Sequence, residues 1–212
     1  CIGACGTFFV FSDYMKPAAR MSALMELPVK YIWTHDAFRV GEDGPTHQPI
    51  EHEAQIRLLE KLKNHSGRNS FLVLRPADSA ETSVAWAMAM ENKNSPTGLI
   101  LSRQNVHDIP AKKGSTRIAD ANSARFGAYI VNDVEGSPDV ILIANGSEVY
   151  TILEGAKILL EKHNIISQVV SVPSEGLFRE QSKEYQNTVI PKGKPVFGLT
   201  AGIPSCLENL AG

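Results

Sequence analysis

Short apolar runs alternate with longer polar segments along most of the chain. The runs are three to five residues long and rich in β-branched or aromatic side chains, which is typical of β-strands. Residues 71–74, Phe-Leu-Val-Leu, show no polar alternation, as expected of a sheet covered on both faces. The predicted strands are residues 7–11, 29–33, 71–74, 97–101, 129–131, 140–144, 168–172 and 195–199.

Apolar residues at helical spacing between these runs predict helices. The first is bounded by two prolines, because Pro17 suits a first helical turn and Pro28 lies just past the expected end. Another helix has a capping-box-like start, with Asp78 three residues before Glu81. The predicted helices are residues 17–26, 50–62, 79–91 and a long helix that opens at residues 146–148.

The order of these elements indicates an α/β fold. Helical crossovers between successive strands require the strands to be parallel. We therefore predict a mostly parallel sheet with helices on both faces, followed by a second, smaller α/β domain. Residues 106–124 show no clear period and change to Pro, Lys, Gly and small polar residues, which indicates a linker. The predicted limits are 1–108 for the first domain, 109–125 for the linker and 126–212 for the second domain, which we expect to be incomplete because no closing helix follows its last strand.

Residues 34–49, Thr-His-Asp-Ala-Phe-Arg-Val-Gly-Glu-Asp-Gly-Pro-Thr-His-Gln-Pro, concentrate the candidate chemistry. Two glycines and two prolines exclude a continuous helix or central strand, so a loop is expected after strand 29–33. Ligands of open α/β sheets gather beyond the carboxyl ends of the strands, where His35 is placed. Strand 97–101 should deliver Arg103 to the same edge of the sheet.

Four polar residues at this edge are therefore candidates for binding and catalysis. His35 and His47 can exchange protons near neutral pH, and Asp43 could orient a neighbour or a sugar hydroxyl. Arg103 offers a planar fork for phosphate oxygens, so an anionic substrate is indicated. The alternative is a salt-linked loop that binds no ligand.

Three evenly spaced aromatic residues and four further histidines lie outside this loop. Phe8, Phe11 and Tyr14 are spaced three apart, and they form either core packing at a strand-to-helix corner or an aromatic wall for a planar heterocycle. The remaining histidines lie in polar or helical surroundings, and we expect them at the surface. They are His52, His65, His107 and His163.

Composition narrows the function classes further. The formal net charge of −2 and the lack of a long basic run argue against binding nucleic acid or a membrane surface. No apolar run approaches the roughly 20 residues that span a bilayer, and no secretory signal is recognisable. Three cysteines without a second ligand pair predict neither a disulfide framework nor a zinc site, so no metal ligand is assigned. We expect a soluble intracellular protein.

Motifs across almost the whole chain resemble those of transketolase, and they occur in the family's order. They are residues 7–14 (Thr-Phe-Phe-Val-Phe-Ser-Asp-Tyr), 34–36 (Thr-His-Asp), 41–49 (Gly-Glu-Asp-Gly-Pro-Thr-His-Gln-Pro), 75–78 (Arg-Pro-Ala-Asp), 101–104 (Leu-Ser-Arg-Gln) and 144–149 (Ala-Asn-Gly-Ser-Glu-Val). The resemblance implies the thiamine-diphosphate-binding fold. It also implies transfer of a two-carbon ketol unit from a ketose phosphate, such as xylulose 5-phosphate, to an aldose phosphate, such as ribose 5-phosphate, in the pentose phosphate pathway.

The same resemblance implies roles for the candidate residues. The three aromatic residues Phe8, Phe11 and Tyr14 would enclose the aminopyrimidine ring of thiamine diphosphate.

The polar residues would bind the sugar phosphate. His35 and Arg103 would hold the phosphate, and Asp43 would meet a hydroxyl near the carbonyl. His47 would contact the first hydroxyl of the donor and help in proton transfer.

Some family features have no counterpart in this sequence. The glutamate that activates the cofactor lies upstream of the aromatic stretch in the family, and no Gly-Asp-Gly followed by asparagine occurs here. The ligands of the cofactor's Mg²⁺ or Ca²⁺ are therefore expected in a missing diphosphate-binding domain. We expect a fragment of transketolase that is inactive alone, forms a homodimer as part of the full-length chain, and acts in the cytoplasm or, alternatively, a plastid.

Two kinds of alternative function stay open. One is another thiamine-dependent ketol transferase, such as dihydroxyacetone synthase or deoxyxylulose-phosphate synthase. The other is a non-catalytic, transketolase-like partner subunit.

Overall fold

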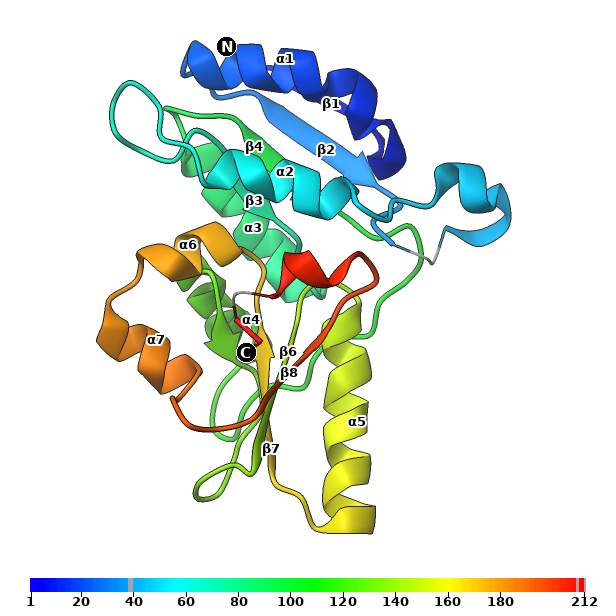
Figure 1. Cartoon of the computed structure of the whole chain (residues 1–212), viewed down its shortest axis with the longest axis vertical. Coiled ribbons are helices and arrows are strands. Elements are labelled where there is room, and N and C mark those ends of the chain that lie inside the picture. Colours follow the sequence, from blue (N-terminus) through cyan, green and yellow to red (C-terminus); the bar gives the residue numbers. More distant parts are fainter. Residues whose placement is uncertain (38–39, 209, 212) are drawn as a thin grey trace.

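The computed structural model describes residues 1–37, 40–208 and 210–211, and its helices surround two β-sheets (Figure 1). All strand pairs of the first sheet are parallel. Its strands, in spatial order, are β1 (Ala4–Phe8), β2 (Lys30–Thr34), β4 (Thr97–Ile100) and β3 (Leu72–Leu74). The helices between them in sequence are α1 (Ser12–Leu24), α2 (His52–Glu60) and α3 (Ser79–Glu91).

Helices cover both faces of this sheet, as predicted. On one face, Trp33 of β2 and Ile100 of β4 pack with Ile56 of α2 in a buried cluster. On the other face, Leu99 of β4 packs with Val84 of α3. Alternate residues of each strand thus enter opposite cores, which explains the continuous apolar runs in the sequence.

The second sheet is mixed, because β5 runs antiparallel to β7 while the other pairs are parallel. Its strands, in spatial order, are β5 (Tyr129–Ile130), β7 (Ser167–Ser171), β6 (Val140–Ala144) and β8 (Val196–Leu199). The helices of this part are α4 (Arg117–Ala121), α5 (Glu148–His163), α6 (Glu175–Glu180) and α7 (Lys183–Val189).

The two sheets share one apolar core. The cluster that contains Leu74 and Leu99 of the first sheet also contains Leu142 of β6 and Val149 of α5. The two parts are therefore packed against each other and not merely joined by the chain.

Helix α3 spans the residues that the sequence predicted. The Asp78 carboxylate accepts a hydrogen bond from the Glu81 backbone N–H at 2.8 Å, which caps the first turn. Glu81 does not return the bond to Asp78 as a capping box would. Its carboxylate accepts instead from the Ala77 backbone N–H at 2.8 Å.

The prediction for the first strand and helix was wrong in its boundaries. Strand β1 ends at Phe8, and residues Phe9–Phe11 form a 3₁₀ turn that leads directly into α1 at Ser12. Pairing with β2 ends with Phe8 opposite Thr34, because the next residue, His35, leaves the extended conformation. Pro17 consequently lies inside α1 and not in its first turn.

The predicted linker contains more regular structure than its sequence indicated. Residues 117–121 form α4, and the Thr116 hydroxyl accepts from the Ala119 backbone N–H at 3.3 Å. Helices α6 and α7 were also missed, although Ser174 and Ser182 cap them. All three helices are short, seven residues at most, so they offer too few turns for apolar periodicity.

Among the described residues, no helix is long and apolar enough to cross a bilayer.

Candidate active site

His35 occupies a strained position at the carboxyl end of β2. Its φ of 61° lies in the left-handed region, which is uncommon for a residue with a side chain. Residues held in such conformations are found most often at functional sites. The imidazole stacks on the Phe8 ring with centroids 3.7 Å apart. Its Nδ1 lies 2.9 Å from the Thr34 hydroxyl. These contacts fix the ring so that Nε2 faces the following loop.

Asp43 lies between His35 and Arg103. Its Oδ2 is 3.6 Å from His35 Nε2 and 3.9 Å from Arg103 Nε. Asp43 belongs to the 3₁₀ turn Gly41–Asp43, whereas Arg103 follows β4. The structure therefore brings the predicted histidine, carboxylate and guanidinium to one edge of the sheet, from three separate segments.

Gly41 allows the Arg103 guanidinium to approach the loop backbone. Its φ is 71°, and a methyl group added there would lie 2.5 Å from Arg103 Nη1. A side chain at this position would displace the guanidinium as well as strain the backbone.

The surroundings favour the neutral form of the His35 imidazole. Burial lowers the pKa of His35 below its ordinary value, and the charges of Arg103 and His47 act in the same direction, whereas Asp43 opposes them. Only 11% of the His35 side chain is exposed. A neutral imidazole engaged through one nitrogen can donate or accept at the other.

His47 joins the cluster from a second 3₁₀ turn, Pro45–His47. Its ring meets Phe8 and Phe11 edge-on, with centroid distances of 5.7 and 5.3 Å. The Thr46 hydroxyl lies 2.8 Å from Nδ1, which leaves Nε2 as the nitrogen that can face a ligand.

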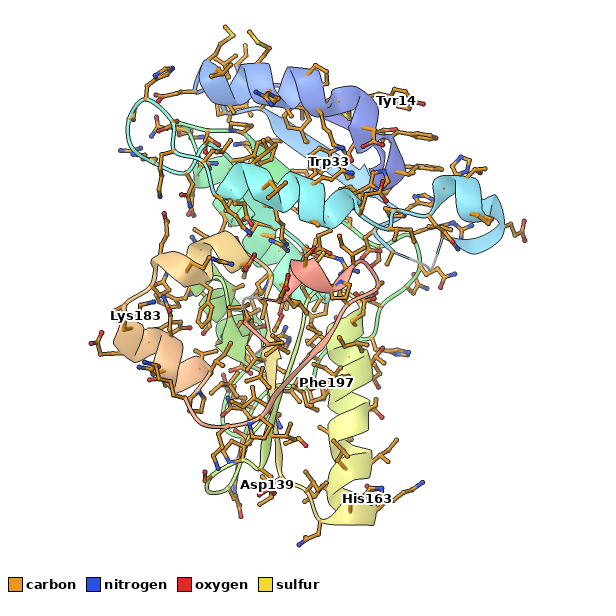
Figure 2. All side chains as sticks on the ribbon, in the orientation of Figure 1. Tyr14, Trp33, Asp139, His163, Lys183 and Phe197 are labelled. Atoms are coloured by element: carbon orange, nitrogen blue, oxygen red, sulfur yellow. The ribbon has the colours of Figure 1, made fainter. Side chains whose placement is uncertain are left out.

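The aromatic residues form a continuous strip beside the histidines. Phe8 and Phe11 are stacked with centroids 6.0 Å apart, and Tyr14 follows Phe11 at 6.1 Å. Tyr14 is 83% exposed and points away from α1 (Figure 2), so the interpretation as ordinary core packing does not hold for it. All seven predicted site residues thus lie in one connected cluster. Phe38 and Arg39 of the same loop lie outside the described residues.

A buried polar network supports this cluster, and the sequence did not reveal it. Arg75, after β3, donates two hydrogen bonds to Asp36, the residue next to His35. It also bonds to Asn145 Oδ1 at 2.6 Å and to Glu53 at 3.3 Å, and its Nη2 lies 2.6 Å from Glu148. Asn145 and Glu148 belong to the part of the chain that contains the second sheet, residues 117–208, which we call the second sheet region. The Arg75 guanidinium therefore connects this region to the loop that carries His35.

The network charges explain why these groups stay paired inside the protein. Three carboxylates surround Arg75, and their attraction, which outweighs the opposing effect of burial, raises the guanidinium pKa above its ordinary value. Burial raises the pKa of Glu148 and Asp36 adds to that effect, whereas the charge of Arg75 opposes both and favours the ionised carboxylate. The four partners of Arg75 come from distant positions in the chain, so only the residue types in the 75–78 and 144–149 motifs hinted at their importance.

Comparison with known protein families assigns both parts of the chain. Residues 2–108 match the family described as "Transketolase, pyrimidine binding domain", and residues 127–212 match "Transketolase-like TK C-terminal domain". The chain belongs to the transketolase family.

Individual transketolases agree with this assignment. The enzyme of Bacillus subtilis is 46% identical over 187 residues, which are 88% of this chain and 26% of that protein. The structure of a Pichia stipitis transketolase mutant complexed with xylulose 5-phosphate superposes with a TM-score of 0.79 at 38% identity and covers 95% of this chain and 27% of that one. This chain therefore spans about a quarter of the length of the transketolases it matches.

A second solved structure shares the fold only. The chain of a split-gene transketolase, described as an inactive β4 tetramer, superposes with a TM-score of 0.70 at 24% identity. The match covers 98% of this chain and 61% of that one.

Proposed function

We propose that this chain supplies the sugar-phosphate side of a thiamine-diphosphate-dependent ketol transferase. The reaction would move a two-carbon unit from a ketose phosphate to an aldose phosphate, as in the pentose phosphate pathway. The observation that carries the proposal is the convergence of two histidines, a carboxylate and a guanidinium beside an aromatic strip. The site residues that we assign are His35, Asp43, His47, Arg103, Phe8, Phe11 and Tyr14.

The aromatic strip fits the planar ring of the cofactor. The uncovered ring of Tyr14 and the half-buried rings of Phe8 and Phe11 offer apolar faces on one side of the cluster. Thiamine diphosphate, when bound, supplies the carbanion chemistry needed to break a bond next to a ketone. Its diphosphate and the accompanying Mg²⁺ or Ca²⁺ would be held by a diphosphate-binding domain, which is distinct from the two domains that these residues match.

The polar residues would bind and orient the sugar phosphate. Arg103 is 42% exposed at its side chain, so its Nη groups can reach a phosphate while Nε faces Asp43. The neutral imidazole of His35 would donate a further hydrogen bond to the phosphate. Asp43 would accept from a sugar hydroxyl, because a carboxylate repels the phosphate itself.

His47 would be the proton carrier nearest the reacting carbons. Its Nδ1 is held by Thr46, and its ring lies against the aromatic strip. We assign it to the first hydroxyl of the donor and to proton transfer there, since a histidine titrates in the range that general acid–base catalysis needs.

The proposal includes a second chain at this site. We propose a homodimer in which the full-length chain contains the diphosphate-binding domain. The present residues would form the pyrimidine-binding domain (1–108), a linker (109–125) and the C-terminal domain (126–212). The name of the split-gene transketolase prompts the other candidate, a separate partner subunit. A cytoplasmic or plastid location belongs to the same proposal.

The test uses the polypeptide as its source cell makes it. An intact mass well above 23.1 kDa indicates the full-length enzyme, and a mass near that value indicates a separate partner subunit, which would be added before assay. We expect transfer from xylulose 5-phosphate to ribose 5-phosphate to fall about 10²-fold or more in His47→Ala. His65→Ala changes an exposed histidine outside the cluster and is the matched control. Unchanged turnover in His47→Ala would contradict the proposal.

The preferred donor and acceptor separate the related enzymes. Formaldehyde as the preferred acceptor would indicate a dihydroxyacetone synthase, and pyruvate as the preferred donor would indicate a deoxyxylulose-phosphate synthase. Absence of any turnover by the completed assembly would favour the non-catalytic partner.

A further inference from the structure

His52 is a buried histidine placed between two exposed carboxylates. It is the first residue of α2 and is only 4% exposed, so the expectation that it lies at the surface was wrong. Its Nε2 lies 3.3 Å from Asp13 Oδ2, and its Nδ1 lies 3.8 Å from Glu51 Oε2. The ring lies beside Asp13 of α1 and 6.0 Å from the centroid of the Phe9 ring, and no local pattern around His52 reveals these neighbours.

The ring of His52 lacks ordinary hydrogen bonds. Within the part of the chain that the structure describes, neither ring nitrogen has a hydrogen-bond partner. Buried polar groups are usually paired, so an unpaired imidazole needs an explanation. A neutral imidazole carries one N–H, which means that at least one of its nitrogens presents a lone pair toward a carboxylate. A nitrogen lone pair that faces a carboxylate oxygen is repelled by it. A cation bound between them would remove this repulsion, because both the nitrogen and the oxygen can donate a lone pair to the cation.

We propose that Asp13, Glu51 and His52 form a binding site for a divalent cation of the zinc class. One ligand atom from each residue lies within 4.8 Å of the others. Ligands at about 2.0–2.2 Å from a tetrahedral zinc are about 3.3–3.6 Å apart, and the 3.3 Å between His52 Nε2 and Asp13 Oδ2 lies at the lower end of that range. Glu51 is 49% exposed at its side chain and can rotate to close the remaining gap.

The charges around the cluster favour a cation. Lys16 pairs with Asp13 through the other carboxylate oxygen, Oδ1, and leaves Oδ2 toward His52. That hydrogen bond lowers the pKa of Asp13 and keeps its carboxylate charged. Two carboxylates and one ammonium leave a net charge of −1 beside a nitrogen ligand. The exposed carboxylates also leave room for water at the fourth position, and an N/O ligand set suits zinc and cobalt.

The ion would connect the first turns of α1 and α2. Asp13 immediately precedes Tyr14, so the ion would also steady the outer end of the aromatic strip. This inference does not depend on ketol transfer, and its test measures metal binding alone.

Equilibrium dialysis with Zn²⁺ and the visible absorption of bound Co²⁺ test the site in the 212-residue chain. Cys1 and Cys5 are exposed and could bind zinc through their thiols, so the parent protein carries Cys1→Ser and Cys5→Ser. We expect one ion per chain with a tetrahedral Co²⁺ spectrum. His52→Gln and Asp13→Asn should each weaken binding at least 10-fold, whereas His65→Gln, at an exposed histidine, should not.

Three results would overturn the proposal. The first is equal affinity in the parent and in His52→Gln. The second is binding that disappears with the two cysteines. The third is no bound ion together with a doubly protonated His52 ring in nitrogen NMR, which would mean that a proton and not a metal satisfies the carboxylates. Asp13→Asn alters a half-exposed side chain, so the test remains decisive if His52→Gln does not fold.

Discussion

Arg75 donates two hydrogen bonds to a single oxygen of Asp36, from Nε at 3.0 Å and from Nη2 at 2.9 Å. Both residues are buried, and Asp36 directly follows the strained His35. The guanidinium thus holds the loop that carries the first site histidine. Because its remaining partners include Asn145 and Glu148, the same contact depends on the second sheet region.

Replacement of Arg75 by methionine should destabilise the chain severely. The change leaves Asp36, Glu53 and Glu148 buried without their common cation, and breaking such a pair costs about 3–5 kcal/mol. Urea unfolding followed by circular dichroism measures the loss. Arg68→Met, at an exposed arginine, is the control and should change the free energy of unfolding by less than about 0.5 kcal/mol. Equal losses in the two variants would show that the network contributes nothing.

Gly41→Ala should damage the phosphate subsite as well as the backbone. Gly44 offers a matched control, because its φ of 73° is nearly the same as the 71° of Gly41 but no atom lies within 4 Å of an added methyl group. Both variants should lose about 1–3 kcal/mol of stability from backbone strain, and Gly44→Ala should lose the more, because its ψ of −168° lies in a region that is almost restricted to glycine. Only Gly41→Ala should also displace Arg103 and weaken binding of a sugar phosphate.

Calorimetric titration of the completed enzyme with xylulose 5-phosphate separates the two effects. Equal affinity in Gly41→Ala and Gly44→Ala would mean that Arg103 does not need its position beside Gly41.

Elements fixed by neighbouring residues in the sequence were predicted correctly, whereas those fixed by contacts with distant residues were not. Helix α3 was predicted residue for residue because its cap, Asp78, is a local signal. The end of β1 was misplaced because it depends on where β2 turns away at His35. Burial of His52 was missed for the same kind of reason, since its neighbours include Asp13, which lies 39 positions earlier in the chain.

The candidate site follows the same rule. Histidines, Asp43 and Arg103 could be predicted to meet because parallel strands end at a common edge. The role of Arg75 could not be predicted, because its partners come from three distant segments. Asp36 follows β2, Glu53 lies in α2, and Asn145 follows β6. The structure brings the predicted residues together, and their roles in binding and proton transfer stay predictions.

His35 should titrate below pH 6.5 in the folded chain. Its folded-state pKa is lowered, mainly by burial, so the folded state binds fewer protons than the unfolded state. The stability that His35 contributes is therefore complete above about pH 6.5 and is lost as the pH falls through the lowered value. Titration of the His35 ring signals by NMR measures this directly.

Two substitutions should move the pKa of His35 in opposite directions. Asp43→Asn removes the negative charge that favours imidazolium and should lower the pKa further. Arg103→Gln removes a positive charge and should raise it. Shifts of the same sign in both variants would mean that these charges do not act on His35.

Tyr129→Phe should weaken the contact between the two sheet regions. The Tyr129 hydroxyl donates to Glu81 Oε1 at 2.5 Å, and both residues are buried. Glu81 keeps the Ala77 backbone N–H and Arg117 as partners, so we expect a loss of about 1–3 kcal/mol in the free energy of unfolding, and not collapse of the site. Burial raises the pKa of Glu81, so its contribution to stability is present below its ordinary pKa and declines as the pH rises through the raised value. Tyr150→Phe, at a half-buried tyrosine of α5 whose ring packs against His107, serves as the control in the same urea titration. If the two variants unfold at the same urea concentration, the buried hydroxyl does not hold α3 to β5.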